Sequence, residues 1–356
     1  MNIVSIETKV INLTLKEPFK IALGVIEALP TILIKIETSD GYTGYGESAP
    51  ISFVTGETLE SVEAAIKVMS QSLIGVDSSC IEKIHEIMNR IFRENNSAKA
   101  GIDIAIYDIL AKRANLPLYK YLGGHASAIT TDKTIPMNTP EKMALAAKKI
   151  VEEGFEIIKV KLGETPTLDI ARIKAIREAI GESTRIRIDA NQGWTKTEAI
   201  KIINTLEQYD IDVIEQPLKY WDLEGHRLVR EKTMIPLMAD ESLFSPMDAI
   251  KIINSNSFDF FNIKLMKSAG LHNALKISSI GEAAGYQCMV GCMGESLVAI
   301  TAGASLVAGR ANVALADVDS TFHIFTPESV TGGVTFEGSK VIFSEKPGLG
   351  IEVEWE

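Results

Sequence analysis

The sequence contains few of the residues that mark several large classes of protein. Only three of its 356 residues are cysteines, at positions 80, 288 and 292, and this number and spacing provide neither a disulfide framework nor a zinc site. We therefore expect free thiols in a reducing compartment. Basic residues are also in the minority, because 36 lysines and arginines stand against 47 aspartates and glutamates, for a net charge of −11. This acidic balance argues against nucleic acid or an anionic membrane as the main partner.

Long apolar segments are missing as well. The longest uncharged stretch toward the C-terminus lies between Ser296 and Arg310, is rich in glycine, alanine and serine, and is too short to span a bilayer. The N-terminal segment MNIVSIETKV lacks the basic start and the apolar core of a signal peptide. The sequence therefore predicts a cytoplasmic protein without a membrane partner.

The first part of the chain shows the pattern of a small mixed domain. Residues 3–15 and 31–38 alternate between apolar and polar side chains, as strands do, and residues 17–30 between them read as a loop. Helical spacing of the apolar residues follows. We predict an N-terminal α+β capping domain at residues 1–123, completed by the C-terminal segment 321–356, which contains two short strands.

A second pattern covers residues 124–320, where short apolar segments alternate with amphipathic helical ones. Eight strands are expected, at residues 133–137, 157–162, 185–190, 213–216, 237–240, 260–265, 287–291 and 313–317. Helices are expected between them, among others at residues 140–153, 168–180, 196–209, 246–254 and 271–284. Eight strands with helical crossovers, and no eighth helix of barrel type after Asp319, favour a catalytic domain that is a modified TIM barrel, (β/α)7β. On periodicity alone, a doubly wound sheet remains an alternative.

Acidic residues stand at the ends of three consecutive predicted strands: Asp189 in RIRIDAN, Glu215 in VIEQP and Asp240 in LMADES. About 25 residues, one strand and one helix, separate each acid from the next. Neighbouring strand ends lie side by side at the mouth of a barrel, so these carboxylates would converge, and their repulsion is costly unless a cation lies among them. Ligands that are all oxygen favour Mg²⁺. The alternative, that each acid caps a helix or a turn, leaves their common position unexplained.

Three lysines are placed to act beside such a cation. Lys159 and Lys161 flank Val160 in one strand, so both face the barrel interior, where two neighbouring positive charges would lower each other's pKa. A lysine that acts as a base needs such a lowered pKa. Lys264 lies four strands further on, which is diametrically opposite in an eight-stranded barrel. Two lysines on opposite sides of one carbon would invert a stereocentre; solvated lysines at an exposed strand end are the alternative.

Two further segments would lie at the barrel mouth. Asp317 and Asp319 end the eighth strand, and two carboxylates that point the same way suit a substrate cation such as an ammonium group. A polar turn would show the same spacing. Cys292, Met293 and Gly294 follow the seventh strand, where small and soft residues suit the wall of an adaptable side chain.

Taken together, these segments resemble the enolase superfamily, in its muconate-lactonizing subgroup, over nearly the whole chain. The segments that carry the resemblance are KVK (159–161), DAN (189–191), EQP (215–217), ADES (239–242), NIKLMK (262–267) and KPGLGIEV (346–353). Within the subgroup, Asp317 and Asp319 resemble the pair with which dipeptide epimerases hold the α-ammonium of a dipeptide.

The resemblance implies a Mg-dependent isomerase that inverts the α-carbon of the C-terminal residue of L,L-dipeptides through a Mg-stabilised enediolate, with Mn²⁺ as a substitute for Mg²⁺. It implies that the substrate carboxylate binds the metal and that Lys161 and Lys264 are the two bases, while Lys159 neutralises the developing oxyanion. It also implies a homo-oligomer. The other residues that it places against the substrate are Thr134, Asn191, Cys292, Met293, Gly294, Asp317 and Asp319.

The cap loop departs from the pattern of the relatives that act on Ala-Glu. These carry PFK-x-AL followed by an arginine for the side-chain carboxylate, whereas PFKIAL (18–23) is followed here by Gly24. We therefore predict neutral or hydrophobic second residues, although Lys20 could serve an acidic one. The residues expected to form an apolar lid instead are Ile21, Val25, Ile26 and Phe53.

Other activities on the same scaffold are alternatives. An N-acylamino-acid racemase or an o-succinylbenzoate synthase would use the same lysines and Mg²⁺, but neither substrate carries an ammonium group for the aspartate pair. Acid-sugar dehydratases of the superfamily use a histidine late in the barrel, and the predicted strand ends have none. The histidines that fall outside them, with expected surface or packing roles, are His125, His226, His272 and His323. A barrel that only binds is disfavoured, because the lysines and acids are all present.

Overall fold

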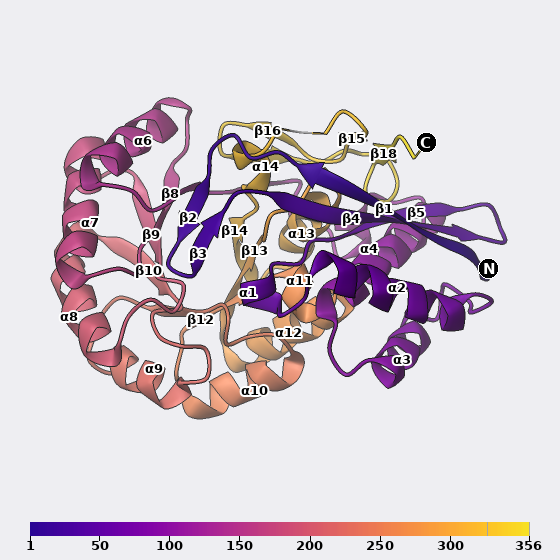
Figure 1. Cartoon of the computed structure of the whole chain (residues 1–356), viewed down its shortest axis with the longest axis horizontal. Coiled ribbons are helices and arrows are strands. Elements are labelled where there is room, and N and C mark those ends of the chain that lie inside the picture. Colours follow the sequence, from indigo (N-terminus) through magenta and orange to yellow (C-terminus); the bar gives the residue numbers. More distant parts are fainter. Residues whose placement is uncertain (326, 356) are drawn as a thin grey trace.

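The computed structural model describes residues 1–325 and 327–355, and Figure 1 shows a cap formed by the first part of the chain beside a barrel. The cap contains an antiparallel sheet in the order β1–β4–β5. Its strands are β1 (Ile3–Leu13), β4 (Leu29–Thr38) and β5 (Thr43–Ser48). Between β1 and β4, in the segment expected to be a loop, the chain forms a small hairpin of β2 (Phe19–Ile21) and β3 (Gly24–Ile26).

Helices cover one face of the cap sheet. Ile32, Ile34 and Ile36 alternate along β4 and are buried against them, as the strand period of two requires. Gly46 allows the longest of these helices to lie directly on the sheet, because a Cβ at this position would lie 1.9 Å from the backbone oxygen of Gly101. The cap helices are α1 (Ser52–Thr55), α2 (Leu59–Leu73), α3 (Ile81–Ile91), α4 (Asn96–Arg113) and α5 (Leu118–Tyr121).

The barrel strands lie between residues 133 and 317, all of which the structure describes. These eight parallel strands lie in consecutive order, so that the doubly wound alternative, in which the order would reverse, is excluded. They are β7 (Lys133–Ile135), β8 (Ile157–Lys161), β9 (Arg185–Asp189), β10 (Ile211–Glu215), β11 (Leu237–Ala239), β12 (Phe260–Ile263), β13 (Gln287–Gly291) and β14 (Val313–Asp317). A hydrogen bond links the two end strands of this sheet, β7 and β14. The N–H of Val318, directly after β14, donates to Thr131 Oγ1, shortly before β7, over 3.0 Å.

Helices lie outside the barrel strands (Figure 1). Several begin at a residue that caps them, such as Thr195, whose side chain accepts from the Glu198 N–H in a capping box. The barrel helices are α6 (Pro140–Glu152), α7 (Pro166–Ile180), α8 (Lys196–Leu206), the 3-10 helix η1 (Glu207–Tyr209), α9 (Leu223–Arg230), α10 (Pro246–Ser255), α11 (Leu265–Ser268), α12 (Leu271–Ala284) and α13 (Leu297–Gly309).

Among the barrel helices of eight residues or more, α9 and α13 have no counterpart in the predicted ranges. α13 coincides with the uncharged stretch before Arg310, and its residues from Val298 to Gly309 are all buried, so it has no polar face that would reveal a helical period. α9 is only 8 residues long. Within residues 1–325 and 327–355, α13 included, no helix has the combination of length and apolar character that spanning a bilayer needs.

The tail returns over both parts of the molecule. After Asp319 there is no eighth barrel helix, as predicted, but only the short α14 (Ser320–His323). In the described part of the tail, four strands follow where two were predicted: β15 (Val330–Gly332), β16 (Thr335–Glu337), β17 (Lys340–Ile342) and β18 (Ile351–Val353). The Leu349 N–H donates to Asp108 of the cap over 2.8 Å, whereas β17 pairs with β6 (Ala128–Thr130), which precedes the barrel. The division at residue 123, with 321–356 assigned to the cap, therefore remains a prediction.

Candidate active site

The mouth of the barrel brings the three predicted acids together. Asp189 and Glu215 are the last residues of β9 and β10, and Asp240 follows β11 directly. Because the ends of these parallel strands lie side by side, one carboxylate oxygen of each acid lies within 4.8 Å of those of the other two. All three side chains are buried.

Two lysines contact this cluster from opposite sides. Lys161, at the end of β8, places its Nζ 2.6 Å from Asp189 Oδ2. Lys264, directly after β12, places its Nζ 2.9 Å from Asp240 Oδ2. The lysines therefore flank the two outer acids of the cluster, which is the arrangement expected from the strand order.

Lys159 lies on the same face of β8 as Lys161. Its Nζ is 2.7 Å from Asp317, 2.8 Å from Glu215 and 3.2 Å from Asp189. Burial alone would lower its pKa, but these carboxylates outweigh burial, so that the pKa of Lys159 lies well above its usual value.

Lys264 shows the same balance. Burial lowers its pKa, and the charges of Asp240 and Glu215 reverse that effect, so its pKa is raised. The expectation that Lys159 and Lys161 lower each other's pKa is therefore wrong for Lys159. That expectation rested on the like charges of the two lysines alone, and Asp189, Glu215 and Asp317 supply opposite charges beside Lys159.

The acids respond unequally to their surroundings. Burial, and then the negative charge of Asp189, raises the pKa of Glu215 to about 8. For Asp189, burial acts in the same direction, but Lys161 and Lys159 outweigh it and lower the pKa to about 2. The repulsion that raises the pKa of Glu215 is the repulsion that a bound cation would relieve.

The donor set fits a hard divalent cation. Three buried carboxylates converge and supply only oxygen, which is the ligand type that Mg²⁺ prefers. Other side chains hold two of them in place: Asn262 Nδ2 donates to Glu215 Oε1 over 2.7 Å, and Lys267 Nζ lies 2.5 Å from Asp240 Oδ1. Such supporting contacts orient metal ligands.

A cavity of about 80 Å³ lies between this cluster and the cap. The predicted site residues that line it are Lys161, Asn191, Asp240, Lys264, Cys292, Met293, Gly294 and Asp319 from the barrel, with Ile21, Ile26 and Phe53 from the cap. Gly24 and Val25 do not line it. Gly24 has a φ of 155°, which disfavours a side chain there, and Val25 faces a different pocket.

The aspartate pair is divided between two tasks. Asp317 is bound to Lys159 and does not line the cavity, whereas Asp319 does. The Asp319 carboxylate accepts from the Thr134 N–H over 2.7 Å and lies 3.1 Å from His323 Nε2. Burial raises its pKa, but His323 and Thr134 outweigh burial and hold the pKa below its usual range. Thr134 therefore positions Asp319 and does not itself line the cavity.

Two titratable residues of the cavity were missed from the sequence. Glu241, next to Asp240 in the ADES segment, accepts from Asn191 Nδ2 over 3.2 Å, and burial followed by the charge of Asp240 raises its pKa to about 7. Its adjacency to a predicted metal ligand was the available signal. His323 was expected to have a surface or packing role; its spacing of four residues from Asp319 was the signal that places both on one side of a helical turn.

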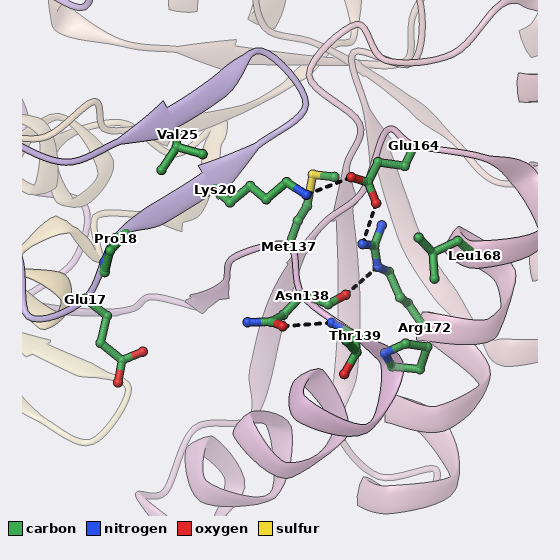
Figure 2. Close-up of a pocket in the computed structure, with 11 residues that line it drawn as sticks. Glu17, Pro18, Lys20, Val25, Met137, Asn138, Thr139, Glu164, Leu168 and Arg172 are labelled. Carbon is green, nitrogen blue, oxygen red and sulfur yellow. Dashed lines mark hydrogen bonds and ion pairs between the residues drawn. The ribbon is translucent and has the colours of Figure 1, made fainter.

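Lys20 is directed away from the cavity. Phe19 and Ile21 of β2 line the cavity, so Lys20 between them lies on the opposite face. Figure 2 shows its Nζ pointing to Glu164 at 2.8 Å, and Glu164 in turn pairs with Arg172 at 2.6 Å. These residues line a separate pocket of about 680 Å³. The alternative that Lys20 serves an acidic substrate group therefore conflicts with its position.

A barrel with three acids at consecutive strand ends, lysines on either side and an α+β cap defines an enzyme of the enolase type. Comparison with known families agrees with this class. Residues 5–123 match the N-terminal domain of the mandelate racemase / muconate lactonizing enzyme family, and residues 142–356 match the enolase C-terminal domain-like model. The chain belongs to this family.

Relatives of known activity are similar over their full length. The hydrophobic dipeptide epimerase of Enterococcus faecalis is 44% identical over 99% of both chains. The L-Ala-D/L-Glu epimerase of Clostridium acetobutylicum is 41% identical over 96% of both. The crystal structure of the Enterococcus faecalis V583 dipeptide epimerase, complexed with Mg and L-Leu-L-Tyr, superposes with a TM-score of 0.97 at 44% identity and covers 99% of this chain and 100% of that one.

Proposed function

We propose that the chain is a Mg-dependent dipeptide epimerase that inverts the α-carbon of the C-terminal residue of L,L-dipeptides. The observation that carries this proposal is the placement of Lys161 and Lys264 on opposite sides of the acid cluster, in one cavity with the Asp319 carboxylate. The activities of the two relatives and the dipeptide in the related crystal structure support it.

Asp189, Glu215 and Asp240 would hold the metal. When bound there, Mg²⁺, or Mn²⁺ in its place, would supply a positive charge that compensates the three acids and attracts the carboxylate of the dipeptide. Lys159, fixed by Glu215 and Asp189, adds a buried positive charge of the protein itself.

The two flanking lysines exchange roles in the two directions of the reaction. One, unprotonated, removes the α-proton of the second residue, and the other, as an ammonium, gives a proton to the opposite face of the same carbon. After one turnover their protonation states are reversed. The same pair can therefore convert either epimer into the other.

The cavity wall indicates which dipeptides fit. Asp319, assisted by Asp317 behind it, would hold the α-ammonium, while Asn191 and the segment of Cys292, Met293 and Gly294 would contact the rest of the dipeptide. The lid opposite presents Ile21, Ile26 and Phe53, and Lys20 is engaged elsewhere. We infer a preference for neutral or hydrophobic second residues. Because a cavity of about 80 Å³ is smaller than typical ligand sites, the lid has to move to admit a dipeptide.

Incubation with Mg²⁺ and a library of L,L-dipeptides in D₂O tests this function. Mass spectrometry should show one deuterium gained in the second residue, most rapidly for apolar ones. Fastest exchange with Glu in second place would contradict the inferred preference. Turnover of an N-acylated amino acid or of a cyclohexadiene acid, without exchange in any free dipeptide, would move the assignment to the racemase or the synthase.

Three wider features are part of the proposal. The resemblance to the superfamily supports a homo-oligomer, which light scattering tests, and the sequence supports a cytoplasmic location, which fractionation tests. The division into a capping domain of residues 1–123 with 321–356 and a barrel domain of 124–320 is supported by a hydrophobic cluster that lies within residues 3–109 of the cap, and by the hydrogen bond from the tail residue Leu349 to Asp108 of the cap.

A further inference from the structure

Two cavities meet beside Asp319. On one side lies the reaction cavity, and on the other a groove of about 550 Å³ runs along α6. Within the described residues, Phe19 and His323 are the two side chains that line both spaces. These two rings therefore form the partition between the reaction cavity and the outer groove.

The main chain holds this partition in place. The rings of Phe19 and His323 meet edge to face, with centroids 5.0 Å apart and an interplanar angle of 74°. The Lys16 N–H donates to the carbonyl oxygen of His323 over 2.8 Å, and Leu15 forms a bridge with Ile324. The two segments that carry the rings are thus paired with each other.

Asp319 lies at the partition itself. His323 Nε2 contacts its carboxylate, and so does the N–H of Thr134, a residue that lines the outer groove. If Asp319 holds the α-ammonium of a dipeptide, a group attached to that nitrogen has to pass between Phe19 and His323. The outer groove is the space that it would enter.

We propose that Phe19 and His323 restrict the substrate to two residues with a free amino group, and that the outer groove accepts an N-terminal extension once they are removed. This inference rests on the proposed function, because it takes the ammonium to lie at Asp319. Lysines outnumber acids in the groove, so an acidic extension is favoured over a basic one. The charged groups concerned are Lys16, Lys133, Lys142 and Lys149, against Glu17 and Glu153.

The test compares exchange in Leu-Leu, Glu-Leu-Leu and Lys-Leu-Leu in D₂O with Mg²⁺. In the wild type, exchange in both tripeptides should be at least about 100-fold slower than in the dipeptide. The double variant Phe19→Ala, His323→Ala should gain about 10-fold or more on Glu-Leu-Leu and less on Lys-Leu-Leu. The matched control His323→Phe keeps a ring in the partition but loses the contact with Asp319, so it should still reject tripeptides. A gain of activity on a longer substrate cannot result from structural damage.

Tripeptide exchange by the wild type at the dipeptide rate would overturn the partition while leaving the proposed function intact. The partition would also be overturned if the double variant still exchanged the dipeptide but gained no exchange in the tripeptides. The milder variants Phe19→Leu and His323→Asn provide the same comparison where the alanine variants do not fold. A wild type that exchanges no dipeptide would overturn the proposed function, and the partition with it.

Discussion

The barrel mouth and the hairpin that covers it are held by opposite means. At the mouth, Lys159 contacts three acids and every partner is buried. Along the hairpin, Lys20 and Glu164 form an ion pair whose side chains are 46% and 30% exposed. Loss of one partner of a buried pair costs roughly 3–5 kcal/mol, whereas an exposed pair contributes about 0–1 kcal/mol. The residues of the chemistry are therefore locked together, whereas the ion pair that holds the hairpin of Ile21 and Ile26 contributes little to stability.

The largest effect should follow removal of either flanking lysine. In Lys161→Ala or Lys264→Ala, we expect epimerisation to fall by about 10²–10⁴-fold, because one of the two proton transfers has lost its group. The remaining lysine should still exchange the α-proton of the one epimer that it faces, which NMR in D₂O detects on L,L- and L,D-dipeptides separately. Lys174→Ala, on the exposed face of α7, is the control. Equal loss of exchange for both epimers in each variant would contradict the two-sided arrangement.

Acid should weaken the barrel through His226, which is buried. Burial lowers its pKa from 6.5 to about 4, so between these values the unfolded chain binds a proton that the folded chain does not. The contribution of neutral His226 to the free energy of unfolding is therefore fully present above pH 6.5. It decreases by up to about 3 kcal/mol as the pH falls to 4. Urea unfolding of the wild type and His226→Gln at pH 7 and 4.5 measures this. An equal acid-induced loss in both proteins would assign the sensitivity to other groups.

The next largest effect should follow removal of a side chain that holds one of the metal ligands in place. Asn262→Ala removes the donor that holds Glu215 over 2.7 Å, and we expect the Mg²⁺ affinity to fall about 10–100-fold. Calorimetric titration measures it, with Asn204→Ala on the exposed side of α8 as the control. An unchanged affinity would show that the protein holds Glu215 without Asn262.

The lid should control substrate choice and little else. Ile26→Arg places a cation in the cavity wall, and the ratio of kcat/KM for Leu-Glu over Leu-Leu should rise by about 10-fold or more. Val25→Arg is a matched control, because the neighbouring residue faces the other pocket (Figure 2) and should leave the ratio unchanged. A similar change in both variants would mean that charge anywhere on the hairpin suffices.

The smallest effect is expected at the exposed ion pair. Lys20→Gln breaks the pair with Glu164 and leaves the contact between Glu164 and Arg172 in place. Because such exposed pairs contribute about 0–1 kcal/mol, KM should change by about five-fold at most while kcat stays the same. Steady-state kinetics at low and high salt measures this. A large decrease in kcat would show that the hairpin is locked as firmly as the barrel mouth, which would abolish the contrast between the two regions.

The same contrast explains what could be predicted from the sequence. Asp189, Glu215, Asp240 and the lysines were located because strand ends of a barrel converge in a fixed order, so their sequence positions determine their neighbours. The contact of Asp317 with Lys159 and the raised pKa of that lysine depend on several side chains at once, which no single segment shows. His323 was missed because its place is set by pairing with residues near the opposite end of the chain.

That pairing has a consequence for how the active site matures. Lys16 contacts the backbone of Phe322, 306 positions later, and closing such a long loop is slow and costly in entropy. A nascent chain that has emerged as far as Asp319 already contains every lysine and acid of the barrel mouth, but not the segment on which the hairpin rests. The part of the site that selects the substrate is thus the last to be completed during synthesis.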